Sequence, residues 1–312
     1  MENEKPRIEF YRQRTFSEKL NVTFQFIREN WKPLLKYSFY IIMPVCLIQT
    51  LATNAFFDTY IGLIVSSTGG NIFNDSMYNF FVNYGIMMLC MMIGGAIMSG
   101  LIYAMMQTYA TRENRLRDVT LDDFKEILTK NTWKYLRIIF LILFVYLLIA
   151  SIVLFLAYIS MITLFLTVPI LIVFIILLIP IMIVAPVYIF ERDIKLIAAI
   201  KKAWILGTAT LWGMLGLIIV LNIIASVVQT VTMMPWYLTI VISSVFSIAS
   251  ESTMNQSFFY KIIVYILGLL QSFGMYVSMI IGIIGLAFQY FHAREKIEGI
   301  TLESNISNFD AL

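Results

Sequence analysis

The fold is decided by residues 138–190, IIFLILFVYLLIASIVLFLAYISMITLFLTVPILIVFIILLIPIMIVAPVYIF, which contain no Asp, Glu, Lys or Arg in 53 positions. A helix needs about 20 apolar residues to cross the hydrocarbon core of a bilayer, so this stretch is long enough for two crossings and a short turn. Its apolar residues are continuous and do not alternate with polar ones, which argues against a barrel of strands. The stretch therefore predicts a pair of transmembrane helices.

The rest of the chain continues this pattern. Of its 312 residues, 60% are apolar and 13% are charged, whereas a soluble domain averages about 45–50% and about 25%. This composition excludes an ordinary soluble globule and a disordered chain. The uncharged run 203–250 is expected to hold one span and a segment at the far interface. We predict an all-α polytopic membrane protein, a single membrane domain over residues 1–312, with six transmembrane helices at about 37–57, 85–109, 138–158, 168–189, 209–229 and 262–288.

The basic residues lie on one side of this arrangement. Of 22 Lys and Arg, all but Lys261 fall before span one, between spans two and three, between spans four and five, or after span six. Basic loops stay on the cytoplasmic side, so we expect both termini in the cytoplasm. The net charge of +3 reflects this topology or contact with anionic phospholipid headgroups, and not nucleic-acid binding.

An amphipathic segment, a Trp and a pair of spans recur in the same order, which indicates three repeated units. Indole rings favour the headgroup zone of a bilayer, with the apolar body inward and the N–H toward water. The units cover residues 15–111, 112–190 and 191–293 between two cytoplasmic tails, 1–14 and 294–312, and their interfacial indoles are Trp31, Trp133 and Trp212.

Helix-start signals support this division. Thr15 and Glu18 form a capping box before the first amphipathic segment, and Thr120 and Asp123 do so before the second. We therefore expect three cytoplasmic amphipathic helices that lie in the membrane interface. The apolar stripe of the first helix consists of Phe16, Leu20, Ile27 and Trp31.

The third unit carries a family resemblance. Its sequence APVYIFERDIKLIAAIKKAWILGTATLWGML, residues 185–215, resembles the membrane domain fused to some bacterial glycerophosphoryl diester phosphodiesterases and the related YciC-type six-span inner-membrane proteins. One departure is Ala203, where many relatives are expected to have a small hydroxyl residue. The resemblance implies a six-span fold without catalytic residues in the membrane domain. The matching positions are Pro186, Glu191, Lys201, Lys202, Trp204, Gly207 and Trp212.

These positions are candidates for structural or lipid-contact roles. Pro186 lacks a backbone N–H and is expected to bend the fourth span near its cytoplasmic end, which places Glu191 at a corner. We expect Asp193 to cap the following helix and Gly207 to end it. Lys201 falls among three isoleucines on an apolar face, so its ammonium either snorkels or turns inward to meet a carboxylate or a lipid phosphate, while the neighbouring lysines point elsewhere.

No residue set supports catalysis or metal binding. His292, the one histidine, lies at the cytoplasmic end of the last span and is expected to be interfacial. The outward acids Asp58, Asp75 and Glu251 lie in different loops, which makes solvated carboxylates a better interpretation than a calcium site. The Met-rich stretch 87–92 could bind Cu(I), but adaptable packing is the simpler explanation. We expect no catalytic residues, no metal and no cofactor.

A few polar and small residues lie within the spans. Gln49, Asn222 and Gln271 either line a passage or bond helices together, and Asn222 is placed to reach Gln271 across the last hairpin. No charged residue lies deep in a span, which argues against an ion-coupled pump. The sixth span carries a small-residue ladder typical of a central helix or a homo-oligomer seam, formed by Gly274, Ser278 and Gly282.

The sequence therefore favours a non-enzymatic accessory or scaffold protein of the bacterial cytoplasmic membrane that interacts with lipid. The alternative is a transporter or channel for an uncharged or lipid-like solute, which would need a polar cleft at mid-membrane. A membrane-embedded enzyme ranks third because it lacks a residue set for catalysis.

Overall fold

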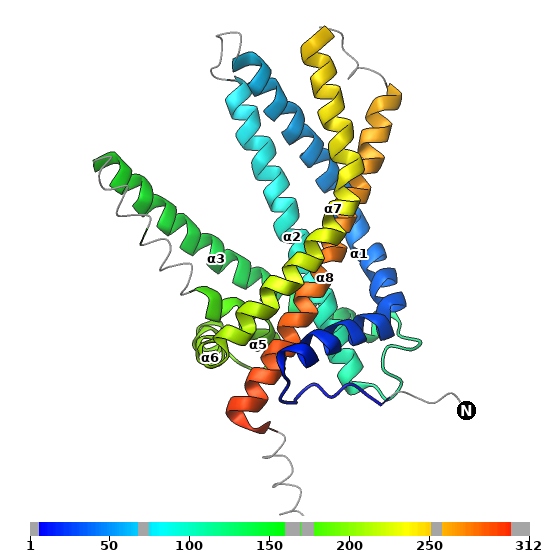
Figure 1. Cartoon of the computed structure of the whole chain (residues 1–312), viewed down its shortest axis with the longest axis vertical. Helices are drawn as coiled ribbons and strands as arrows, with labels where there is room; N and C mark the ends of the chain where they lie inside the picture. Colours follow the sequence, from blue (N-terminus) through cyan, green and yellow to red (C-terminus); the bar gives the residue numbers. More distant parts are fainter. Residues whose placement is uncertain (1–5, 68–74, 160–168, 170–177, 251–257, 301–312) are drawn as a thin grey trace, which may run out of the picture. The chain divides into compact units, whose positions relative to one another are not determined.

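The computed structural model describes residues 6–67, 75–159, 169, 178–250 and 258–300. All secondary structure in these residues is helical (Figure 1). The long helices are α1 (Phe16–Ser67), α2 (Asp75–Thr111), α3 (Lys125–Ile159), α7 (Leu211–Ser250) and α8 (Phe258–Glu298). The short elements are the 3-10 turns η1 (Leu121–Asp123) and η2 (Ile179–Ile183) and the helices α5 (Val184–Phe190) and α6 (Leu196–Ala209).

The five long helices are each long and apolar enough to cross a membrane, which confirms an all-α protein with membrane-type helices. They contain the predicted spans one, two, three and six and all of span five except its first two residues, 209 and 210. Most of the fourth predicted span, 168–189, lies outside the described residues, so the count of six stays a prediction. The expected interfacial segment at the end of 203–250 is wrong: α7 continues as one helix of 40 residues, with Pro235 inside it.

The chain divides into two compact units. Unit 1 consists of Met1–Trp31, Ser99–Asn222 and Ile281–Leu312, and unit 2 consists of Lys32–Met98 and Ile223–Ile280. Helices α1, α2, α7 and α8 contribute residues to both units. The predicted division into three repeats stays a prediction.

The predicted helix starts of the first two segments are confirmed. The backbone N–H of Thr15 donates to Glu18 Oε2 over 2.7 Å, and the N–H of Glu18 donates back to Thr15 Oγ1 over 3.4 Å. Thr120 N–H donates to Asp123 Oδ2 over 2.7 Å. These bonds satisfy backbone donors that have no partner within the helix.

The amphipathic helices precede their spans in two different ways. A break at Asn30 (φ −120°, ψ 17°) separates the first turns of α1 from the rest of that helix, and Thr210 (φ −127°, ψ 20°) separates α6 from α7 in almost the same conformation. The expected separate helix of the second unit is wrong, because α3 runs unbroken from Lys125 to Ile159. Its sequence contains no Gly or Pro that would interrupt the backbone ladder.

Aromatic rings form the centre of unit 1. Phe26, Tyr109 and Phe288 are fully buried, and the ring of Phe10 inserts among them, stacked on Tyr109 with centroids 5.8 Å apart. Phe10 also lies 4.9 Å from the ring of Phe291. These contacts hold the extended residues 6–15 against α1, α2 and α8 within the unit.

Polar side chains and small residues join the helices of unit 2. The hydroxyls of Thr50 and Ser272 lie 3.2 Å apart, and Trp236 Nε1 donates to Asn54 Oδ1 over 3.0 Å. A side chain at Gly274 would meet Thr232 Oγ1 at 2.1 Å, so this member of the small-residue ladder packs α8 against α7 inside the unit.

The short helix α6 packs against η2 and α5 in unit 1. The prediction that Gly207 ends this helix is wrong: α6 continues to Ala209, and Gly207 lies inside it. A Cβ at Gly207 would lie 2.2 Å from the carbonyl oxygen of Pro180, so the residue is needed for close backbone approach and not for a turn.

We expect Gly207→Ala to lower the free energy of unfolding by about 2 kcal/mol, because the backbone of η2 must move to admit the methyl group. The matched control is Gly282→Ala in α8, where no atom lies within 4 Å of the added Cβ. That variant is expected to be neutral or slightly stabilising. Thermal unfolding of the purified chain in detergent measures both, and equal midpoints for the two variants would contradict the packing argument.

Candidate functional site

A chain reversal after α5 brings charged residues together in unit 1. Glu191 leaves the helix in an extended conformation (φ −86°, ψ 132°), and Asp193 adopts a left-handed one (φ 56°), which Asp tolerates better than most residues. Two side chains bind the free carbonyls at the end of α5: Lys134 Nζ donates to Tyr188 O over 2.6 Å and Gln107 Nε2 to Ile189 O over 3.3 Å. Side chains from α2 and α3 therefore satisfy carbonyls at the end of α5 and stabilise the chain reversal.

Four charges meet at this corner, and we call Glu191, Lys202, Arg294 and Glu298 the four-charge network. Lys202 Nζ lies 2.7 Å from Glu191 Oε1 and 2.7 Å from Glu298 Oε1. Arg294 Nε lies 2.9 Å from Glu298 Oε2 and 3.8 Å from Glu191 Oε1. Positive and negative groups thus alternate, and the network joins the end of α5, α6 and the end of α8.

Two tyrosines complete the network. Tyr290 donates its hydroxyl hydrogen to Glu191 Oε1 over 3.3 Å, and Arg294 Nη1 donates to the hydroxyls of Tyr290 and Tyr11 over 3.0 and 3.2 Å. The Glu191 side chain is only 10% exposed. A carboxylate this deeply buried requires several partners, and the network supplies them.

Of the alternatives for Lys201, the inward contact with a carboxylate is wrong, whereas snorkelling and contact with a lipid phosphate stay predictions. The Lys201 side chain is exposed, and the neighbouring Lys202 binds the Glu191 carboxylate. The reason is the start of the helix: α6 begins at Leu196 after an extended Lys195, and Asp193 does not cap it. The buried face consists of Ala199, Ala203, Leu206 and Gly207.

The outward face of α6 is apolar with one charge. Ile197 is 71% exposed and Ile205 59%, and both share this face with Lys201 and Trp204. The interfacial indoles predicted from the sequence are also outward in unit 1. Their exposed fractions are 51% for Trp31, 61% for Trp133 and 83% for Trp212.

Pro186 lies in the first turn of α5, where a missing N–H costs no hydrogen bond. The preceding 3-10 turn ends at Ile183, which is not helical (φ −85°, ψ 9°). The predicted bend of the fourth span at Pro186 stays a prediction, because most of that span lies outside the described residues.

A buried lysine was missed by the sequence reasoning. Lys19 is 3% exposed, and its ammonium donates to Gln289 Oε1 over 2.7 Å. Gln289 Nε2 in turn donates to Thr210 Oγ1 over 3.0 Å, so the bonds run from α1 through α8 to the residue between α6 and α7. The sequence signal was a lysine one turn from Phe16 and Thr23, beside the apolar stripe.

Residues 9–14 wrap around a buried arginine. The Arg14 guanidinium donates to the carbonyls of Phe10 over 2.9 Å, Arg12 over 3.4 Å and Glu9, and its backbone N–H donates to His292 Nδ1 over 2.9 Å. Burial lowers the pKa of Arg14, and the charge of Arg12 lowers it further, yet an arginine stays charged at any physiological pH. A buried cation is therefore balanced here chiefly by carbonyl dipoles.

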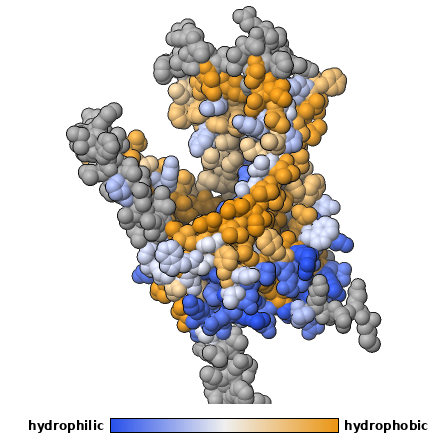
Figure 2. Space-filling view, in the orientation of Figure 1, coloured by the Kyte–Doolittle hydropathy of each residue, from blue (hydrophilic) through white to orange (hydrophobic). Residues whose placement is uncertain are grey.

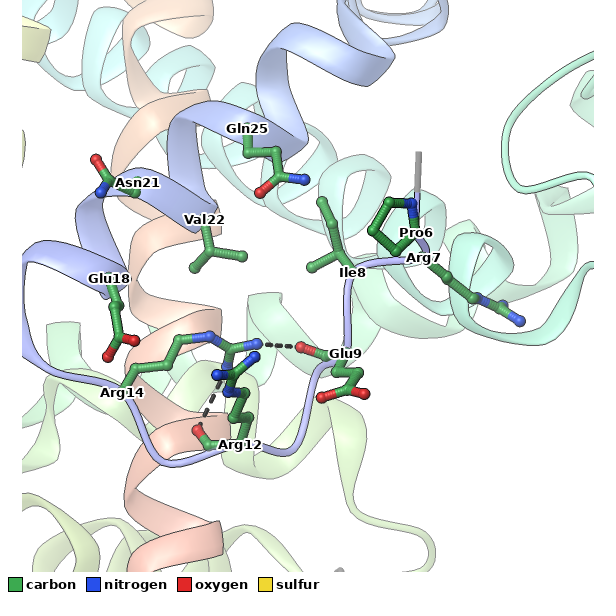
Figure 3. A pocket seen from close by; sticks show the side chains of 10 residues that line it. All are labelled: Pro6, Arg7, Ile8, Glu9, Arg12, Arg14, Glu18, Asn21, Val22 and Gln25. Atoms are coloured by element: carbon green, nitrogen blue, oxygen red, sulfur yellow. Dashed lines mark hydrogen bonds between the residues drawn. The ribbon is translucent and has the colours of Figure 1, made fainter. Parts of the chain in front are cut away.

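A pocket of about 330 Å³ lies between this segment and the start of α1 (Figure 3). Arg12 and Arg14 line one end of it, and Glu18, Asn21 and Gln25 line it from the helix. In Figure 2 hydrophilic residues gather on the part of unit 1 that contains the start of α1 and the end of α8.

The predicted intramembrane polar residues bond within their own units. Gln49 is fully buried and accepts a hydrogen bond from the Tyr276 hydroxyl, and Gln271 accepts one from Ser272 over 3.3 Å. Asn222 Nδ2 donates to Ile218 O on its own helix over 2.8 Å, and its contact with Gln271 stays a prediction. The Asn222 side chain is exposed.

Across the described part of the chain, no three His, Cys, Asp or Glu side chains gather in a way that could hold a metal ion. No protein-family model, no curated protein and no solved structure matches the chain.

We expect Lys202→Gln to lower the free energy of unfolding by about 2 kcal/mol, because the buried Glu191 carboxylate loses its closest cation; the exposure of Glu298 and the remaining contacts of Arg294 keep the loss below that of a fully buried pair. Lys201→Gln is the control and should change it by less than about 0.5 kcal/mol. Thermal unfolding in detergent compares the two. A larger effect at Lys201 would show that the network does not hold α6.

Proposed function

We propose that this chain is a non-enzymatic accessory or scaffold protein of the bacterial cytoplasmic membrane, of the six-span type that its third unit resembles. In this proposal α6 lies on the membrane surface and its outward face contacts anionic lipid. The proposal includes six spans with both termini in the cytoplasm, supported by the confinement of 21 of the 22 basic residues to the segments on one side.

The observation that carries the proposal is the two-sided character of α6. One side is fastened to the protein by Gly207 against Pro180 and by Lys202 in the four-charge network. The other side presents two isoleucines, Trp204 and a single lysine to the surroundings. An apolar face with an indole and an ammonium suits the boundary between acyl chains and phosphates.

The polar contacts of unit 2 also favour a scaffold. Thr50, Asn54 and Ser272 bond to side chains on neighbouring helices, which is how polar residues join helices in lipid. The exposed apolar residues of α3, including Phe140, Phe144 and Leu154 at 59–70%, suit contact with acyl chains.

Lipid retention tests the role of α6. A lysine near an anionic surface contributes about 1 kcal/mol, so Lys201→Gln should reduce the phosphatidylglycerol retained relative to phosphatidylcholine by up to about fivefold. The measurement is native mass spectrometry of the chain extracted from vesicles containing equal amounts of the two lipids. Lys195→Gln, also exposed, is the matched control. Equal losses in the two variants would mean that only net charge matters.

One observation favours the alternative of a transporter for an uncharged solute. In the described residues, Gln49 Nε2 and Thr53 Oγ1 are buried without a hydrogen-bond partner, one helical turn apart on α1. Unsatisfied polar groups of this kind are found where water or a solute enters.

Cysteine labelling separates the two functions. In a scaffold, a Thr53→Cys thiol should not react with a water-soluble maleimide from either side of the membrane, because the site is packed. The control is Thr120→Cys, which is exposed and should react once the cytoplasmic side is opened. Reaction of the Thr53→Cys thiol at a comparable rate would favour the transporter.

A further inference from the structure

The first turns of α1 have a buried face, with Lys19, Thr23 and Phe26, and two further faces. The apolar stripe of Phe16, Leu20, Ile27 and Trp31 points to one side. At 100° per residue, Glu18, Asn21 and Gln25 point to the opposite side, where the 330 Å³ pocket lies (Figure 3). If the stripe faces lipid, the pocket faces water.

The pocket contains two guanidinium groups, those of Arg12 and Arg14, neither of which lies in close contact with a carboxylate in the described part of the chain. Within the described residues, neither Arg12 nor Arg14 forms an ion pair. Glu9 and Glu18 also line the pocket, and they act at longer range: Glu18 on both arginines and Glu9 on Arg14, whereas the charge of Arg12 opposes that of Arg14. Arg14 is fixed by carbonyls, whereas Arg12 is exposed and has its guanidinium beside that of Arg14 (Figure 3). Two adjacent like charges are unfavourable until an anion binds both.

The chemistry of these groups selects a phosphate. A guanidinium offers planar paired donors that match phosphate oxygens, and two of them match a doubly charged group better than a single carboxylate. Because the pocket lies at the small end of ligand-site volumes, it suits a phosphate with few additional atoms.

We propose that this pocket binds a phosphate group, held by Arg12 and Arg14. The phosphate belongs to a small soluble phosphate compound or to a lipid headgroup that reaches over the start of α1. This site is separate from the lipid-facing surface of α6, and the proposal does not depend on that surface.

Isothermal titration calorimetry of the full chain in detergent tests the site with inorganic phosphate as the probe. The parent chain should bind with saturation and one site per chain. Arg12→Gln should weaken binding about tenfold or more, as expected for a lost hydrogen bond between charged groups. Asn21→Leu should weaken it as well, because the leucine fills the pocket without changing its charge.

Arg28→Gln is the matched control, since Arg28 is exposed on the same helix and does not line the pocket. Its affinity should stay within about twofold of the parent. The absence of saturable binding, or an equal loss in Arg28→Gln and Arg12→Gln, would overturn the proposal. A parallel titration with dihexanoyl phosphatidic acid identifies the source: tighter binding than phosphate that is lost in Arg12→Gln assigns a lipid headgroup, and equal binding assigns a soluble phosphate.

Discussion

Unit 1 depends on one electrostatic arrangement, in which a single ammonium lies 2.7 Å from each of two carboxylates, one at the end of α5 and one at the end of α8. Partly buried charges persist only when each has close partners of opposite sign, so Lys202 fixes the rotation of α6 about its axis. A rotation by one residue, about 100°, would take the closest cation from Glu191 and one of two cations from Glu298, and it would turn the indole of Trp204 away from the surface. The contacts of Lys202 therefore determine which residues of α6 face outward, namely Ile197, Lys201, Trp204 and Ile205.

Features encoded by neighbouring residues could be predicted from the sequence. The apolar runs indicated the long helices, because length and hydropathy are local properties. The capping boxes at Thr15 and Thr120 were also predictable, since both partners lie within three residues. The helix break at Asn30 was predictable only in part. An amphipathic segment before Trp31 was expected, but the non-helical conformation of Asn30 was not.

The rest depends on partners that are distant in sequence. Choosing between Lys201 and Lys202 required the first residue of α6, which depends on a left-handed Asp193 and on side chains from α2 and α3 that bind the end of α5. Lys19 bonds a glutamine 270 positions away. Periodicity within one helix cannot report such partners, so the pairing of Lys202 with Glu191 was not predicted and the buried Lys19 was missed.

The start of α1 shows why a simple amphipathic pattern was an incomplete interpretation. One face, with Lys19, Thr23 and Phe26, is buried against unit 1; a second carries the apolar stripe; the third borders the arginine-lined pocket. A helix shared among packed protein, acyl chains and water cannot have only two kinds of face, and its apolar and polar residues must be divided among three sectors of about 120°. The break at Asn30 lets this helix take up that orientation independently of the direction of the span that follows. The same division accounts for the positions of the cations. Lys19 lies on the buried face, and Arg12 and Arg14 lie at the face that borders the pocket.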